Sequence, residues 1–156
     1  MVCAPHRFFN QFRGFVLEAG LYPAVFFTVA MMITAGYFLL GGLPLLILQH
    51  DTPLDARFVR GFFRVYCKAA LYSAAGATAG FALWGRVPFA LGALVMALLA
   101  VVIRRTLLPA MQNLEPRMLA QESTAVGAFR RLHVALLCIN LAQLAVIVWG
   151  VTQISF

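Results

Sequence analysis

The sequence predicts an all-α membrane protein, a bundle of four transmembrane helices with a short N-terminal helix lying in the membrane interface. Hydrophobic residues make up 63% of the 156 residues and charged residues only 11%. The mean hydropathy is +0.90, whereas soluble domains are about half apolar and a quarter charged. Because one helical crossing takes about 20 apolar residues, a chain of this length holds about four crossings and their connections.

The first element is expected at residues 1–20, as an interfacial amphipathic segment. Its apolar side chains recur at helical spacing with polar residues between them, a pattern typical of a helix that lies flat in the headgroup region. These apolar residues are Phe8, Phe9, Phe12, Phe15 and Val16. The transmembrane domain then covers residues 21–156, with spans at about 21–48, 66–85, 88–108 and 131–153.

The second helix is expected to begin at Pro53, because Thr52 can cap it and proline suits the first helical position. It should continue to about Trp84, so that roughly two or three of its turns project beyond the hydrocarbon layer. Its second half carries small residues at helical spacing, including the GxxxG pattern, and such a face lets another helix approach closely. These are Ser73, Gly76, Ala77 and Gly80. The neighbour is either a helix of this chain or one of a partner.

The third helix is expected to start near Pro88 and to end by about Leu114, because Pro109 and Pro116 interrupt regular helix. A polar connection follows, and Ser123 or Thr124 can cap a fourth helix over about 125–154.

Basic residues dominate the charge, with a net charge of +7. They flank the predicted spans, and no groove-reading motif accompanies them, which argues against nucleic acid as a partner. We expect most of them to contact lipid headgroups or another anion: Arg57, Arg60, Arg64, Lys68, Arg104, Arg105, Arg130 and Arg131. Because connections rich in Lys and Arg stay in the cytoplasm, the pattern predicts a multi-pass protein of a bacterial inner membrane with both termini in the periplasm.

Three polar residues lie on one face of the last span: His133, Asn140 and Gln143. The first interpretation is an interhelical hydrogen-bond network, because an amide exposed to lipid has no partner. The alternative is a ligand site in which His133, with His50 from the end of the first span, holds a haem b or a metal ion. The three cysteines are far apart and show no metal-binding spacing.

The final span resembles that of the Transmembrane Protein 205-like family, small four-span proteins whose last helix opens with Phe, a basic residue and Leu-His, followed by Asn. The matching residues are Phe129, Leu132, His133 and Asn140. The segments GGLPLL, RFVRGFFRVY and RRTLLPAMQNL are similar as well. The resemblance implies the four-helix architecture but no reaction. The phenylalanine-rich N-terminus departs from the family pattern.

The function expected from these observations is that of a non-catalytic accessory or structural subunit packing against a larger membrane complex. All five acidic residues fall at span edges or in connections, whereas ion-coupled carriers keep carboxylates inside their spans. No catalytic motif occurs in the sequence. We expect no cofactor, and membrane lipids, other subunits or a second copy as partners. Binding of haem, metal, lipid or pigment and a permeation module formed by oligomerisation remain as alternatives.

Overall fold

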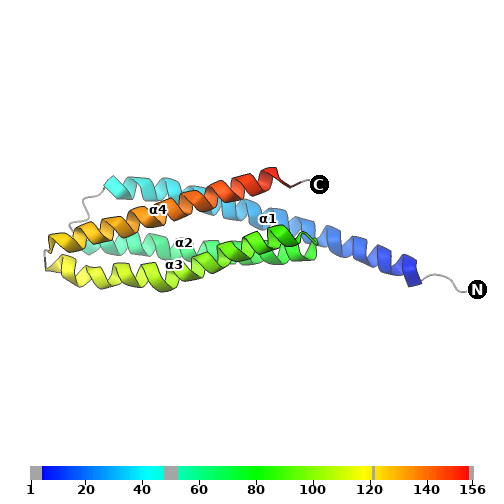
Figure 1. Ribbon diagram of the computed structural model, residues 1–156, viewed down its shortest axis with the longest axis horizontal. Coiled ribbons are helices and arrows are strands. Elements are labelled where there is room, and N and C mark those ends of the chain that lie inside the picture. Colours follow the sequence, from blue (N-terminus) through cyan, green and yellow to red (C-terminus); the bar gives the residue numbers. More distant parts are fainter. Residues whose placement is uncertain (1–4, 48–52, 121, 155–156) are drawn as a thin grey trace, which may run out of the picture.

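The structure, a computed structural model, describes residues 5–47, 53–120 and 122–154, and all of its regular elements there are α-helices. Helix α1 spans Pro5–Ile47, α2 Pro53–Leu83, α3 Val87–Leu119 and α4 Ser123–Thr152. The four long helices run side by side (Figure 1). His50 and Thr52, for which a ligand and a capping role were predicted, lie outside the described residues.

Each helix of the bundle packs along two others: α2 lies between α1 and α3 on one side, and α4 lies between the same two helices on the other side. We call the end with the α2–α3 turn the hairpin end. The opposite end, where α1 leads to α2 and α3 leads to α4, is the loop end. Successive helices therefore alternate in direction (Figure 1).

Helix α1 is continuous from Pro5 to Ile47, so the expected separate helix at residues 1–20 is not seen. No capping or turn sequence interrupts the chain between Gly14 and Gly20, and the helix also accommodates Pro23 and Pro44. Its N-terminal part extends past the hairpin end of the other three helices (Figure 1).

The α2–α3 turn is short because Gly85 ends α2 in a left-handed conformation, with φ of 78°. The Arg86 amide donates to the Phe81 carbonyl at 2.9 Å and the Gly85 amide to the Ala82 carbonyl at 3.1 Å, the pair of bonds that closes a helix at a left-handed glycine. The Arg86 guanidinium stacks over the Trp84 ring at 5.0 Å. The hairpin end is therefore fixed by local interactions.

Helix α3 passes through both prolines that were expected to end it, and it continues to Leu119. The prediction of an end by Leu114 is therefore wrong. Pro109 and Pro116 are exposed, so water can bond the carbonyls that lose an intrahelical donor. The expected cap of α4 is also wrong, because Glu122 takes the capping position, and its side chain makes no capping hydrogen bond there.

Among the described residues, three helices are long and apolar enough to cross a membrane, which supports a membrane protein. They contain the stretches Glu18–Leu46, Val87–Met118 and Thr124–Thr152. Helix α2, which holds the predicted span at 66–85, is not among them. Its sequence is less apolar because basic residues occupy its first half, and its second half contains Ser73, Thr78 and two glycines.

The core has two parts of different composition. The part toward the loop end is built from large side chains, with Phe63, Phe129, Met111 and Leu136 almost fully buried. The part toward the hairpin end is built mainly from alanines of α1, α2 and α3. The helices therefore come closer together at the hairpin end.

Glycines set this close approach between α1 and α2. A Cβ at Gly80 would lie 2.4 Å from the Ala24 nitrogen, and one at Gly20 would lie 2.4 Å from the Trp84 nitrogen. At Gly76 a Cβ would meet the Phe27 ring at 2.6 Å. The small-residue face predicted on α2 is thus covered by α1 of the same chain.

Candidate functional site

The three polar residues predicted to share one face of the last span all lie inside the bundle. His133 and Asn140 are completely buried and Gln143 is 5% exposed. Asn140 contacts α1, whereas His133 and Gln143 contact α2, so the three residues connect α4 to two of its neighbours.

Gln143 bonds α4 to α2. The Tyr66 hydroxyl donates to the Gln143 side-chain oxygen at 2.5 Å, and both side chains are buried. Tyr66 also packs its ring on Phe38 of α1, with the ring centroids 5.2 Å apart. Tyr66 is therefore a partner of the predicted network that sequence reasoning missed. The two residues are 77 positions apart, and no local pattern marks such a pair.

Asn140 bonds α4 to α1. Its amide nitrogen donates to the Ala35 carbonyl at 3.2 Å. Its side-chain oxygen is buried and has no hydrogen-bond partner in the described part of the chain. The side chain of Asn140 is therefore only half satisfied, which lowers its net contribution to stability.

His133 lies against an aromatic ring. The Phe63 ring and the imidazole form a T-shaped pair, with an angle of 78° between the ring planes and the ring centroids 5.4 Å apart. Because α4 carries His133 and α2 carries Phe63, this contact joins the two helices in the loop-end core. His133 is fully buried there, and the described residues contain no group of three His, Cys, Asp or Glu that could hold a metal ion.

Two cavities lie in the half of the bundle nearer the hairpin end. The smaller, of about 20 Å³, is bordered by Tyr66, Ser73 and Gln143 among others, and it has room for one water molecule. The larger, of about 270 Å³, is a groove between α3 and α4, lined by residues that include Phe89, Gly92, Met96, Ile147, Trp149 and Gly150. His133 lines neither of these two cavities.

The predicted headgroup residues divide into one that is paired and seven that are exposed. Arg60 forms an ion pair with Glu115 of α3, with 2.9 Å between Nη1 and Oε1, and both side chains are largely buried. The contact between these two atoms is an ion pair that does not have the geometry of a hydrogen bond. The exposed residues are Arg57, Arg64, Lys68, Arg104, Arg105, Arg130 and Arg131.

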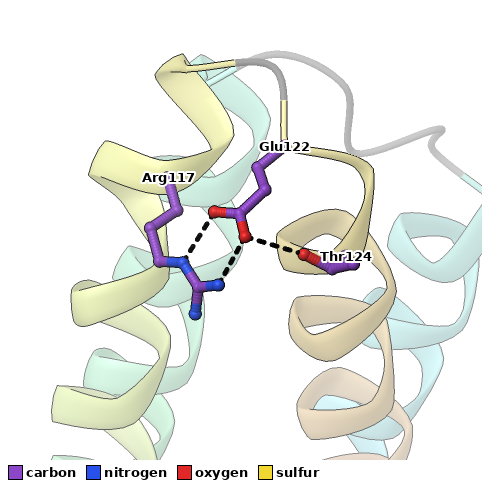
Figure 2. Close-up of polar contacts among 3 residues, drawn as sticks. All are labelled: Arg117, Glu122 and Thr124. Atoms are coloured by element: carbon purple, nitrogen blue, oxygen red, sulfur yellow. Dashed lines mark hydrogen bonds and ion pairs between the residues drawn. The ribbon is translucent and has the colours of Figure 1, made fainter.

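The connection between α3 and α4 holds a second ion pair (Figure 2). Arg117 binds Glu122 through two nitrogens, with Nε to Oε2 at 2.7 Å and Nη2 to Oε1 at 2.5 Å. The Thr124 hydroxyl donates to the same carboxylate at 2.9 Å. Hydrogen bonds from Arg117 and Thr124 hold the pKa of Glu122 below its usual value. This carboxylate therefore stays charged as the pH falls toward the ordinary range of glutamate.

Comparisons of the chain with protein-family models, with curated proteins and with solved structures found no match. The resemblance to the Transmembrane Protein 205-like family therefore stays a prediction. Of its four matching residues, Phe129, His133 and Asn140 are fully buried.

Proposed function

We propose that the protein is a non-catalytic accessory subunit of a membrane complex, which docks a helix of a larger membrane protein against its α3–α4 groove. The observation that carries this proposal is the groove itself. Its volume is about 270 Å³. Between α1 and α2, by contrast, the two backbones are in contact.

The groove has the shape of a docking site because two glycines leave it open. No atom lies within 4 Å of a Cβ built on Gly92 of α3 or on Gly150 of α4. An apolar cavity of about 150 Å³ is enough to hold benzene, so this groove accommodates large apolar side chains. A whole helix, about 10–12 Å across, would lie over the groove with such side chains inserted.

The interior supports a structural role rather than chemistry. The Tyr66–Gln143 bond and the Asn140–Ala35 bond each join two helices, and interhelical bonds of this kind hold membrane bundles together. His133 packs against Phe63, an arrangement that leaves little room beside its ring for a haem.

The docking test uses the full chain, extracted in mild detergent with its tag, and native mass spectrometry. The wild-type protein is expected to carry one other membrane protein in a fixed ratio. Gly92→Phe is expected to abolish that association because its ring fills the groove. Gly127→Phe is the matched control, because Gly127 is an open, exposed glycine of α4 that is not among the residues lining the groove.

Two results would contradict the proposal. One is a wild-type protein that appears only as a monomer or with copies of itself. The other is a complex that survives Gly92→Phe as well as it survives Gly127→Phe.

The proposed location is a bacterial inner membrane, with α2 as a fourth span and both termini in the periplasm. The distribution of basic residues supports this orientation, because nine of the twelve lie between residues 57 and 68 or between 104 and 131, at the loop end. Helix α2 is flanked by two apolar helices, and Ser73 in its second half is buried.

Orientation can be measured with single cysteines in a variant that lacks the three native ones. Thr152→Cys marks the hairpin end and Asn113→Cys the loop end, and both residues are exposed. An impermeant thiol reagent added to whole cells is expected to label Thr152→Cys and to reach Asn113→Cys only after permeabilisation. Labelling of Asn113→Cys alone in intact cells would mean that the orientation is reversed.

A further inference from the structure

The exposed surface of α3 changes character after Val102. The large apolar residues exposed on this helix all lie at or before that position: Val87, Leu91, Leu94, Val95, Leu98 and Val102. From Arg104 onward, the described exposed residues of the helix are basic, polar or proline. The rise from Val87 to Arg104 is about 26 Å, close to the hydrocarbon thickness of roughly 30 Å. The edge of the hydrocarbon layer therefore falls near Arg104.

The two prolines of α3 support the same boundary. Pro109 and Pro116 are exposed and lie inside the helix, so the carbonyls of Arg105 and Gln112 lose their helical donors. In hydrocarbon such carbonyls would have no other donor, whereas water or headgroups supply one. The last turns of α3 therefore stand outside the hydrocarbon layer.

Three exposed cations of α2 and α3 gather at this boundary. Helices α2 and α3 pack along each other on either side of the turn at Gly85. Arg104 therefore lies about level with Lys68, which is at a similar distance in sequence on the other side of that turn. Arg64 lies one turn farther toward the loop end on the same face of α2. All three side chains are exposed.

These three cations are not neutralised by the described acidic side chains of the loop end. Glu115 is paired with Arg60 and Glu122 with Arg117. The positive charge of Arg64, Lys68 and Arg104 is therefore available to an anionic partner from outside the described structure.

We propose that Arg64, Lys68 and Arg104 bind the phosphate of an anionic phospholipid headgroup at the edge of the membrane. Arginine matches phosphate oxygens with paired N–H groups, and lysine adds a compact charge. Headgroups occupy about 5–8 Å beyond the hydrocarbon, and the turn from Lys68 to Arg64 spans about 6 Å. The site is independent of the docking groove, which lies between α3 and α4.

The test measures lipid binding to the full chain in mild detergent by native mass spectrometry. Phosphatidylglycerol and phosphatidylcholine with the same acyl chains are titrated separately, and inorganic phosphate is added as a competitor. Each cation near an anionic headgroup contributes about fivefold in affinity. The variant with Arg64→Gln, Lys68→Gln and Arg104→Gln is therefore expected to lose about 100-fold in affinity for phosphatidylglycerol.

A second triple variant provides the matched control: Arg57→Gln, Arg130→Gln and Arg131→Gln. These exposed residues carry the same charge but lie farther toward the loop end, since Arg130 and Arg131 precede His133, which packs on Phe63. This control is expected to lose less than about tenfold. Thermal unfolding without added lipid verifies that each variant folds, and Arg104→Gln alone replaces the first triple if that variant does not.

Three results would overturn the proposal. Equal losses in the two triple variants would indicate general charge attraction, and equal affinity for the two lipids would exclude headgroup recognition. Displacement of the lipid by millimolar inorganic phosphate would assign the site to free phosphate instead.

Discussion

Replacing Gly80 by alanine is expected to lower the free energy of unfolding by about 3 kcal/mol, the upper end of the usual cost of overpacking. The new Cβ would lie 2.4 Å from the Ala24 nitrogen and 2.9 Å from the Pro23 carbonyl carbon. Both atoms belong to the backbone, so no side-chain rotation relieves the overlap, and α1 must move away from α2. Unfolding in mild detergent, followed by circular dichroism, measures the change.

The matched control is Gly61→Ala in the same helix. A Cβ there meets no atom within 4 Å, and alanine is the better helix former by about 1 kcal/mol. This variant is expected to be as stable as the wild type or slightly more stable. Equal unfolding of the two variants would mean that α1 and α2 do not pack at Gly80 as described.

Replacing Tyr66 by phenylalanine is expected to cost about 1–3 kcal/mol, because it leaves the Gln143 oxygen buried without its donor. Interhelical bonds in membrane proteins often contribute less, roughly 0.6–2 kcal/mol. Tyr72→Phe serves as the control, since Tyr72 lies on the same helix and is 72% exposed. The same detergent unfolding assay compares the two variants.

A double-mutant cycle separates the bond from other effects of the substitution. Gln143→Leu removes the acceptor, so adding Tyr66→Phe to it should cost less than Tyr66→Phe costs alone. If the two single costs simply add, the Tyr66 hydroxyl and the Gln143 oxygen do not interact in the folded protein.

Local signals in the sequence predicted several features of the fold well. Helix α2 begins at Pro53 as expected, because proline at the first helical position is a strong local signal. The all-helical fold and the long apolar helices α1, α3 and α4 follow from composition and length, and the structure contains both.

The sequence was less informative where a helix end or a side-chain partner depends on residues distant in the chain. A proline ends a helix only where no other donor replaces the backbone hydrogen bond that it removes. Whether Pro109 and Pro116 are exposed to such donors depends on how the helices pack, which the local sequence does not indicate. Arg60 looks like its neighbours in the basic stripe, yet Glu115 of another helix pairs with it. The partner of Gln143 could likewise not be predicted, because Tyr66 fits the pattern of an aromatic residue at the membrane interface.

The short turn at Gly85 has a consequence for how the chain enters the bilayer. Closing a loop of so few residues costs little chain entropy, and local contacts form early in folding. Helices α2 and α3 are therefore expected to insert together as one hairpin, with the strongly apolar α3 carrying its less apolar neighbour across. Helix α4, whose bonds to Ala35 and Tyr66 join residues distant in the chain, would then complete the assembly last.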